Sequence, residues 1–508
     1  MSCPDLEKFK QLAAAHNLVP VARELIVDLD TPLTIFSKVA GERSHAFLFE
    51  SLEGGEKWGR YSFIGFDPLL LFTSRGEKVE IRRRRGMILD GSDGDESGYT
   101  LEQLQGDPLQ LLEGLLADLN PAVSESALPR FCGGAVGFLG YDMVRFMERI
   151  PQVNPPLEDM PESSFIIPRV VLVYDNLRQR LTVVNWVVVA PGSNSETLYS
   201  QAEKQIDRVV ADLGRPLAPE PLTQPASDAA PAHQFVSNME PREFKAMVER
   251  AKEYIRSGDI IQVVLSQRFK TNTAIGPIRL YRALRHINPS PYLFYLKLGD
   301  LVQIGSSPEI LVRLEDDDIE LRPIAGTRPR GKSHEEDLAL ERELLADPKE
   351  RAEHLMLVDL GRNDVGRVAR YGTVEVRDLL VVERYSHVMH IVSGVHGKLA
   401  PEKNQFDVVR ACFPAGTVSG APKIRAMEII EELEPQRRGP YAGAVGYFGF
   451  TGNMDLCITI RTFVMLGDEL WVQAGAGIVA DSDPESEFVE TVNKSMGLRR
   501  ALQLAETV

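Results

Sequence analysis

Cysteine is scarce in this chain, with four residues among 508 that lie far apart and form no C-x-x-C pair. Disulfide frameworks and cysteine-rich zinc sites need paired or closely spaced cysteines, so the sequence argues against both. Reduced thiols in a cytoplasmic protein are expected at all four positions, which are Cys3, Cys132, Cys412 and Cys457.

Long apolar runs are missing as well. The most apolar stretch, residues 181–190, is interrupted by Asn185 and is much shorter than the roughly 20 residues that a membrane helix needs. Its loose alternation of β-branched residues is typical of a core strand. The first 20 residues carry no apolar core behind a basic start, so no secretory signal is expected.

An excess of positive charge is also lacking, because the formal net charge is −16 at pH 7. This balance argues against nucleic acid or an anionic membrane as the main partner. If the substrate is itself an anion, the binding site must supply its own local cations.

The composition is typical of a globular protein with a large core, since 44% of the residues are hydrophobic and 26% are charged. A proline-rich stretch between residues 214 and 231 marks the clearest boundary. It predicts an N-terminal α/β region over residues 1–214, a linker over residues 215–234 and a second region over residues 235–508.

Strand-like and helix-like patterns alternate on both sides of the predicted linker. Expected helices cover residues 109–118, 197–213 and 241–257, and expected strands cover residues 46–49, 69–73, 135–139, 165–174, 181–189 and 260–269. The order shows no repeating βαβ rhythm, which favours a mixed fold with many antiparallel strands. Glycine-rich residues 133–141 also resemble residues 442–450. The two copies suggest two facing sheets built on similar strands, with coincidence in a glycine-rich chain as the alternative.

Two segments, 347–356 and 483–494, each begin with Asp-Pro, which is typical of a helix start. Each places two glutamates one helical turn apart on one face, and Lys494 shares the face of the second pair. The pairs are Glu350 with Glu353 and Glu487 with Glu490. Such carboxylates suit a hard divalent cation such as Mg²⁺, although an arbitrary pair is more often a solvated surface charge. Glycines between residues 474 and 477, interpreted as a strand-to-loop run, would let backbone amides approach a ligand carboxylate.

Three histidines lie close together near residue 390, but no matching acid motif accompanies them and their neighbours are apolar. We expect them to be structural; they are His387, His390 and His396.

From about residue 235 to residue 500, the order of motifs resembles the chorismate-utilising enzymes. The likeness rests on Arg461 and on residues 262–267, 306–309, 323–327, 353–360, 413–423, 441–447 and 475–477. Residues 49–51 and 59–65 are a looser match to the N-terminal pattern of anthranilate synthase, which binds tryptophan as a feedback inhibitor. The resemblance implies an α+β fold of two facing, largely antiparallel β-sheets flanked by helices.

The resemblance also implies roles for individual residues. Chorismate would be bound by Gly326, Thr327, Tyr441, Arg461, Gly475, Ala476, Gly477 and Lys494. Mg²⁺ would be held directly by Glu353 and Glu490, and through water by Glu350 and Glu487. L-tryptophan would occupy a pocket formed by Ser51, Pro291, Tyr292 and Leu293. Since chorismate carries two carboxylates, Mg²⁺ and the two basic side chains would supply the cations that an acidic protein needs.

Ala325 decides between the activities of these enzymes. Relatives that aminate chorismate at C4 carry a lysine at this position whose amine adds to the ring, whereas alanine offers no nucleophile. Gln262 stands where water-adding relatives have a lysine base, and glutamine cannot activate water. The resemblance therefore implies an anthranilate synthase large subunit, which catalyses the first committed step of tryptophan biosynthesis.

In this reaction ammonia attacks C2, the C4 hydroxyl leaves, and loss of pyruvate then gives anthranilate. Hydroxide is a poor leaving group, so a positioned acid is needed, for which Glu309 is the first candidate and His354 the second. The alternatives are aminodeoxychorismate synthase, isochorismate or salicylate synthase, and a non-catalytic tryptophan-binding regulator.

The chain shows no source of ammonia. A glutaminase needs a nucleophilic cysteine on a tight turn with a histidine partner, and Cys132, the nearest match, is expected to be a small buried residue. A separate glutamine amidotransferase subunit is therefore implied, in a heterotetramer of two copies of each chain. Free ammonia should also support the reaction.

Overall fold

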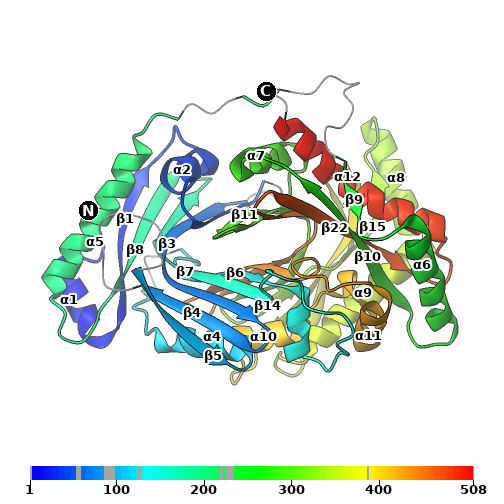
Figure 1. Cartoon of the computed structure of the whole chain (residues 1–508), viewed down its shortest axis with the longest axis horizontal. Coiled ribbons are helices and arrows are strands. Elements are labelled where there is room, and N and C mark those ends of the chain that lie inside the picture. Colours follow the sequence, from blue (N-terminus) through cyan, green and yellow to red (C-terminus); the bar gives the residue numbers. More distant parts are fainter. Residues whose placement is uncertain are drawn as a thin grey trace.

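The computed structural model describes residues 3–52, 59–84, 98–123, 129–217, 221–223, 234–385 and 388–506. Its named strands form one hydrogen-bonded network, in which each pairing between them is antiparallel. The N-terminal part of the chain lies on the left in Figure 1 and the C-terminal part on the right.

Two long strands connect the whole network. β3 (Tyr61–Arg75) and β7 (Ser163–Asp175) pair along their length, with a register shift between Pro68 and Leu70. Before this irregularity β3 pairs with β2 (His45–Glu50), and after it with β4 (Lys78–Arg84). β7 likewise pairs with β8 (Arg180–Val188) at one end and with β6 (Gly134–Leu139) at the other. The network therefore divides into two sheets at the β3–β7 pair.

The first sheet begins at β1 (Leu18–Ile26) and runs through β8, β7, β3 and β2. It continues through β11 (Tyr292–Leu298), β12 (Leu301–Ser307), β21 (Thr462–Leu466), β22 (Glu469–Ile478) and β10 (Gln262–Asn272). The short strands β9 (Val236–Ser237) and β18 (Gly420–Ala421) flank β10.

The second sheet begins at β5 (Tyr99–Gln105) and runs through β4, β3, β7 and β6. It continues through β19 (Ala444–Gly449), β20 (Met454–Ile458), β13 (Ile310–Glu315), β14 (Asp318–Leu321) and β17 (Val388–Lys398). β15 (Ile324–Pro329) and β16 (Glu375–Arg384) pair with opposite edges of β17.

The inner faces of the two sheets share one hydrophobic cluster. Phe47, Phe294 and Trp471 of the first sheet pack in it with Phe138 and Tyr447 of the second. Burial of such large aromatic side chains is among the main stabilising contributions in a core. The α+β fold with two facing, largely antiparallel sheets flanked by helices is confirmed.

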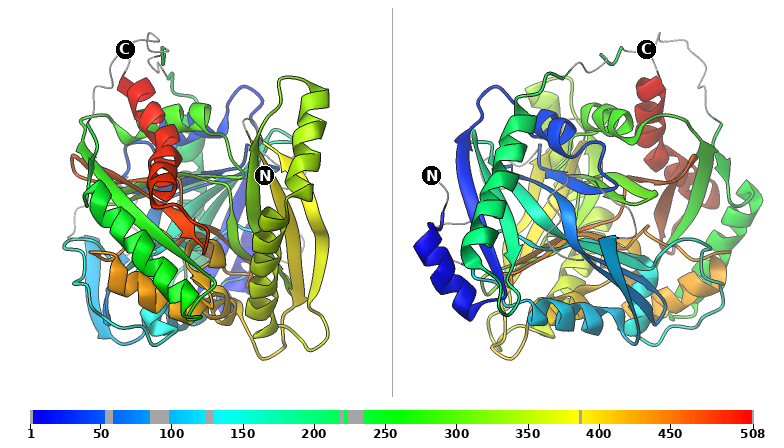
Figure 2. Two further views of the ribbon diagram at one scale, coloured as in Figure 1. Left: turned by 90° about the vertical axis from the view of Figure 1, so that its right-hand side faces the viewer. Right: turned by 60° about the vertical axis from the view of Figure 1, so that its left-hand side comes forward.

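Helices cover the outer faces (Figures 1 and 2). α2 (Pro32–Val39), α5 (Ser195–Leu213), α7 (Pro277–Ile287) and α12 (Pro484–Glu506) contribute to a core cluster with the first sheet. A second cluster gathers α4 (Pro108–Asp118), α6 (Pro241–Arg256), α9 (Pro348–Gly366), α10 (Gln405–Cys412) and α11 (Lys423–Leu433). α1 (Leu6–Ala15) packs on α5, and α8 (His334–Ala346) precedes α9.

The expected helices and strands are found where the patterns predicted them, and most boundaries differ by at most a few residues. The exception is the expected strand 69–73, which is only the second half of β3, since β3 begins at Tyr61. The glycine-rich repeat gave one wrong interpretation. Its two copies do not lie in separate facing sheets but are the adjacent strands β6 and β19, with Gly137 opposite Gly446. A Cβ atom on Gly137 would lie 2.0 Å from the Ser164 carbonyl oxygen, so glycine is required there for close backbone approach.

The predicted linker at residues 215–234 falls largely outside the described residues. Strands from both sides of it share both sheets, since β2 pairs with β11 and β6 pairs with β19. The division into two regions stays a prediction.

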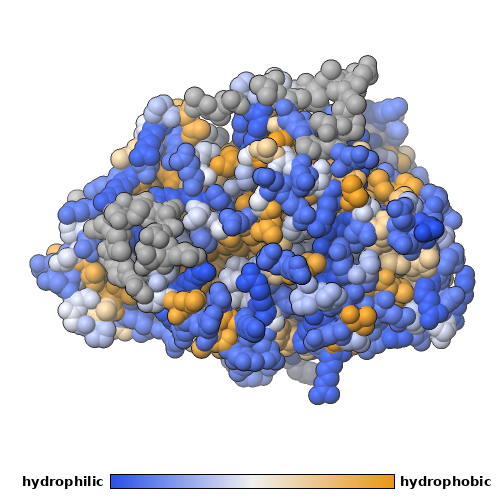
Figure 3. All heavy atoms as spheres, viewed as in Figure 1, coloured by the Kyte–Doolittle hydropathy of each residue, from blue (hydrophilic) through white to orange (hydrophobic). Residues whose placement is uncertain are grey.

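Among the helices that the structure describes, none is both long and apolar enough to cross a bilayer, and the face in Figure 3 is mostly hydrophilic with apolar residues scattered across it. The four cysteines are free thiols.

Candidate functional site

The two predicted glutamate pairs lie near the starts of α9 and α12. Asp347 caps α9, because its side chain accepts hydrogen bonds from the backbone amides of residues 349 and 350. Asp483 accepts from the amide of Ser486 in the first turn of α12. These contacts satisfy amides that a helix start leaves unpaired. Both predicted helix starts are confirmed.

The glutamates of the two helices share one electrostatic neighbourhood. Burial and the charge of Glu350 raise the pKa of Glu353, while Lys494 of the other helix lowers it. Burial and Glu490 likewise raise the pKa of Glu487, while Lys494 and Lys349 lower it. Each pair is thus influenced by a lysine on the opposite helix, as expected for two acidic faces that meet.

This donor set fits a hard cation in chemistry but is not a preformed cage. Carboxylate oxygens are the ligands that Mg²⁺ prefers, and a cation would relieve the repulsion within each pair. Glu490 is paired with Lys494 at 2.7 Å, and Glu350 with Arg328 at 3.2 Å. Within the described ranges, no three His, Cys, Asp or Glu side chains are gathered closely enough to hold an ion.

β10 and β22 bring Gln262 against the first glutamate pair. The Gln262 amide nitrogen donates to the Glu353 carboxylate at 2.9 Å, and a Cβ on Gly477 would lie 2.6 Å from that nitrogen. The Gln262 carbonyl oxygen is buried without a hydrogen-bond partner. Leaving such a group unpaired costs about 1–3 kcal/mol, which marks this oxygen as a contact point for a ligand.

The predicted glycine run lies inside β22 rather than at a strand-to-loop junction, because residues 474–478 continue the ladder with β10. β21 pairs with β22 only as far as Val472, so the other edge of these residues has no strand partner in the described structure. The Gly475 carbonyl faces that edge and accepts from the Lys494 ammonium at 3.0 Å. In an antiparallel ladder one residue directs both backbone groups to the same edge. The amides of Gly475 and Gly477 therefore face the site.

Arg461 forms no ion pair among the described residues, although the charge of Glu490 acts on it. It lies between β20 and β21 with a φ of 52°, and its guanidinium donates to the Lys494 carbonyl at 3.1 Å. Burial lowers its pKa, and across the described chain no carboxylate lies within ion-pair distance of it. Buried charges need a partner, so this side chain favours an anionic ligand.

The Tyr441 side chain lies next to Gly475 in the same site. A Cβ on Gly475 would lie 2.7 Å from its hydroxyl, and burial raises its pKa to about 12. The hydroxyl therefore stays protonated and can donate a hydrogen bond at neutral pH.

Most of the run Pro323 to Thr327 lies in the bulged edge strand β15, which begins at Ile324. The bulge falls between Ala325 and Thr327, where Gly326 adopts a φ of 67° that glycine tolerates best. His390 of β17 contacts the Gly326 carbonyl at 2.9 Å and the Thr327 hydroxyl at 3.1 Å. A Cβ on Gly326 would lie 3.2 Å from Glu350, so this loop adjoins the first glutamate pair.

Glu309 lies in the turn between β12 and β13 and is 7% exposed. Burial raises its pKa to about 8, against opposing interactions with the Thr417 hydroxyl, the Ile324 amide and the charge of Lys494. The carboxyl is therefore largely protonated at neutral pH, which is the form that a general acid requires.

His354 occupies a different environment. It is fully buried between α9 and β17, with its Nε2 2.7 Å from the Ser393 hydroxyl. Burial lowers its pKa to about 4, so the ring is neutral at pH 7. None of the other predicted site residues is its hydrogen-bond partner. His354 is therefore a weaker candidate for the proton donor than Glu309.

The expectation that His390 is structural agrees with its contacts, since it holds the Gly326 loop, but the sequence reasoning did not predict which loop it holds. Periodicity could not show this, because β17 brings His390 to the loop across more than 60 residues of sequence. Thr417, which adjoins the buried acid, was given no individual role by the sequence reasoning. His387 lies outside the described residues. His396 lies 4.0 Å from Glu320 on β14.

The four residues predicted to bind tryptophan line one cavity of about 80 Å³ between the sheets. Its wall includes Ser51, Pro291, Tyr292 and Leu293, together with the aromatic residues Phe49, Tyr61, Phe63 and Tyr447. Its polar side chains include Arg313 and Asp455, whereas the carboxylate of Glu50, another lining residue, is bound by Tyr281 and Arg285 of α7. Arg313 pairs with Asp455 at 2.7 Å, and Tyr292 donates to the same carboxylate at 3.0 Å.

A family model of chorismate binding enzymes matches residues 60–500. The chain is 47% identical to "Anthranilate synthase component 1" of Acetivibrio thermocellus over 513 residues, with 99% of each chain covered. It is 47% identical to the protein of that name from Aquifex aeolicus, covering 99% of this chain and 98% of the relative.

Among solved structures, anthranilate synthase component I from Streptococcus pneumoniae TIGR4 has a TM-score of 0.72 at 37% identity, covering 88% of this chain and 95% of that chain. The menaquinone-specific isochorismate synthase from Escherichia coli has a TM-score of 0.70 at 20% identity and covers 98% of both chains. At that identity the second likeness concerns the fold alone.

The raised pKa of Glu309 predicts a pH-dependent stability effect. The Glu309 carboxyl titrates near pH 4.5 in the unfolded chain and near pH 8 in the folded protein. Between these pH values the folded protein therefore carries a proton on Glu309 that the unfolded chain has lost. Stability conferred by that proton falls as pH rises through this window, by about 1.4 kcal/mol per pH unit. Glu309→Gln should remove this decline. The difference in free energy of unfolding, variant minus wild type, should therefore increase steadily with pH. It can be measured by urea titrations at pH 5, 6, 7 and 8. A difference that does not change with pH would contradict the assignment.

Proposed function

The chain belongs to the chorismate binding enzymes, among relatives named anthranilate synthase component 1, and we propose that it converts chorismate and ammonia to anthranilate and pyruvate. The observation that supports this most directly is the combination, at one site, of a protonated Glu309 with a buried Arg461 that forms no ion pair among the described residues. This combination suits elimination of a hydroxyl group from an anion.

Substrate binding would use the cations and amides described above. Arg461 can hold one carboxylate through its planar fork, and Lys494 with the Gly475 and Gly477 amides can face another. The Tyr441 hydroxyl, which lies beside Gly475, can donate a further hydrogen bond to the substrate. An acidic protein can bind a dianion in this way, because the positive groups are local to the site.

Glu309 would protonate the leaving C4 hydroxyl. Its pKa of about 8 keeps the proton available at neutral pH while making transfer favourable as negative charge develops. Burial provides this pKa, so water-excluding contacts around Glu309 are part of the acid function.

The nucleophile would be ammonia rather than a side chain or water. Ala325 on β15 carries no amine that could attack the ring, which argues against a lysine-dependent amination at C4. Gln262 has an amide where a base would be needed to activate water, and its unpaired carbonyl oxygen can accept a hydrogen bond from ammonia.

Mg²⁺ would supply positive charge opposite a substrate carboxylate. We propose Glu353 and Glu490 as its direct ligands, with Glu350 and Glu487 acting through water. Their oxygen chemistry and shared electrostatic neighbourhood support this choice. Lys494 and Arg328, which pair with two of these glutamates, would reorient when the cation binds.

Ammonia would come from a separate glutamine amidotransferase subunit, with two copies of each chain in the assembly. Burial raises the pKa of Cys132 to about 12, which keeps the thiol protonated and unreactive. Each of the other buried cysteines also has a raised pKa. These thiols do not suit glutamine hydrolysis, and the word component in the names of the relatives agrees with a partner chain.

Tryptophan would bind as an inhibitor in the cavity between the sheets. The aromatic wall suits an indole ring, and the backbone carbonyls around Pro291 can receive an ammonium group. Ser51 stands at the same wall.

The proposed activity predicts a fluorescent product. Purified protein with chorismate, Mg²⁺ and ammonium should form anthranilate, measured by its emission, and pyruvate, measured by a coupled assay. The rate should increase with the fraction of free NH₃ and fall again above pH about 8 as Glu309 loses its proton. Formation of 4-amino-4-deoxychorismate or isochorismate would reject the proposal, as would no reaction of chorismate at all.

Glu353→Gln should weaken the dependence of turnover on Mg²⁺. The substitution keeps a hydrogen-bond acceptor for Gln262 but removes a ligand charge, so the Mg²⁺ concentration for half-maximal rate should rise by about 10-fold or more. Asp359→Asn, on the exposed face of the same helix, is the matched control and should behave as the wild type. Equal Mg²⁺ titrations for both variants, by activity and by calorimetry, would remove Glu353 from the metal site.

Ser51→Phe should relieve inhibition by tryptophan while sparing catalysis. Filling the cavity wall costs roughly 1–3 kcal/mol of ligand affinity, so the inhibitory concentration should rise by about 10-fold. The neighbouring Leu52 is exposed and does not line the cavity, and Leu52→Phe should leave inhibition unchanged. Unaltered inhibition in the Ser51 variant would place the tryptophan site elsewhere.

A further inference from the structure

A buried ion pair lies directly behind the candidate site. Glu434 and Arg438 lie four residues apart in the segment that follows α11, with side chains 4% and 1% exposed. The guanidinium engages both carboxylate oxygens, at 2.6 Å and 2.9 Å. A bidentate pair of this kind fixes orientation as well as charge.

Arg438 joins three segments that border the site. It donates to the Val418 carbonyl and to the Val264 carbonyl, each at 2.7 Å. Val418 follows Thr417, which contacts the Glu309 acid, and Val264 lies opposite Gly477 in the β10–β22 ladder. The guanidinium also lies 5.6 Å from the centre of the Tyr441 ring.

Glu434 is hydrogen-bonded to the same β10–β22 ladder through Ser266. It accepts from both the amide and the hydroxyl of Ser266, each at 2.8 Å. Ser266 lies opposite Gly475, and Gln473 donates to the Ser266 hydroxyl at 2.9 Å. The two glycines whose amides face the site are therefore backed by residues bound to this one ion pair.

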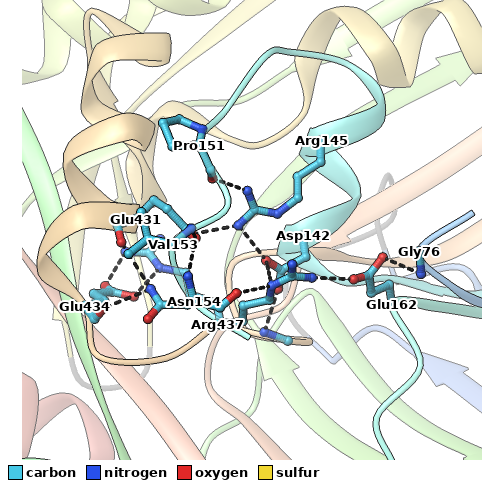
Figure 4. A network of polar contacts seen from close by, with 12 residues as sticks. Gly76, Asp142, Arg145, Pro151, Val153, Asn154, Glu162, Glu431, Glu434 and Arg437 are labelled. Atoms are coloured by element: carbon cyan, nitrogen blue, oxygen red, sulfur yellow. Dashed lines mark hydrogen bonds and ion pairs between the residues drawn. The ribbon is translucent and has the colours of Figure 1, made fainter. Parts of the chain in front are cut away.

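The segment that carries the pair is also fixed from outside, as Figure 4 shows. The Asn154 side-chain amide donates to the carbonyls of Glu431 and Glu434, at 3.1 Å and 3.0 Å. Arg437 donates to the Asn154 carbonyl at 3.0 Å and to Glu162 at 2.7 Å. With both sides held, small displacements of Arg438 are opposed by the surrounding structure.

We propose that the Glu434–Arg438 pair is the positioning element of the site, which sets the relative placement of the Thr417 loop, the Gly475–Gly477 edge and Tyr441. This role rests on the proposed function, because it concerns the geometry of that reaction. Neither side chain lines the ligand-facing edge, so both act through the residues they hold. An arginine is needed because a lysine ammonium cannot reach two carbonyls and a carboxylate in one plane.

Two variants test the role. Arg438→Lys keeps the charge and loses the planar fork, and the Glu434→Gln/Arg438→Met double variant removes both charges so that neither is left unpaired. Arg169→Lys is the matched control, since Arg169 is also buried and paired with a carboxylate, Asp67, in the β3–β7 region.

The measurements are kcat and KM for chorismate with ammonium, and the melting temperature of each protein. Both test variants should lower kcat by about 10- to 100-fold, because small misplacements of reacting groups have effects of that size. The Arg169 control should keep kcat within about twofold of the wild type, whatever its melting temperature.

The outcomes separate this role from the proposed function. Wild-type protein that forms no anthranilate rejects the reaction itself, and the positioning role falls with it. Active wild type together with an Arg438→Lys variant of unchanged kcat overturns the positioning role alone. An equal loss of kcat in the Arg169 control also overturns it, because the effect would then belong to any buried ion pair.

Discussion

A buried arginine that forms no ion pair among the described residues is the constraint around which the candidate site is organised. Arg461 is held by the backbone at the β20–β21 junction and by the Lys494 carbonyl, with no carboxylate in ion-pair range in the described structure. The net charge of the chain is −16, so acidic partners are abundant elsewhere. Keeping them away from this side chain leaves its charge for a ligand. The glycine edge and the Lys494 ammonium extend the same positive region.

The cavity between the sheets is connected to the proposed acid by short stretches of backbone. Tyr292 of the cavity wall pairs with Ser307, two residues before Glu309. Cys457 lines the cavity, and the next residue, Ile458, donates its amide to the Glu309 carbonyl at 3.0 Å. The cavity wall and the turn that carries Glu309 therefore share two direct backbone connections.

Much of the fold followed from local patterns in the sequence. Alternation and turn residues located β6, β7, β8 and β10, and Asp-Pro sequences located the starts of α9 and α12. The placement of the two glycine-rich copies could not be read in this way. Pairing of β6 with β19 joins residues about 300 positions apart, and a local pattern carries no information on such partners. The loop that His390 holds could not be predicted for the same reason, since it is distant in sequence.

Three buried carboxylates illustrate how environment assigns different tasks to one side chain. Glu434 faces Arg438 and Ser266, so its charge is compensated and it serves to hold structure. Glu353 accepts a hydrogen bond from the Gln262 amide, and the charges of Lys349 and Lys494 offset part of its repulsion with Glu350, an environment that suits the proposed divalent cation. Glu309 has no cation in contact, and burial leaves it with a proton. Acid chemistry and cation binding would each be lost if these environments were exchanged. The spacing of glutamates along the sequence could suggest the metal pair, but only the packing around each carboxylate distinguishes an acid from a ligand or a structural anchor.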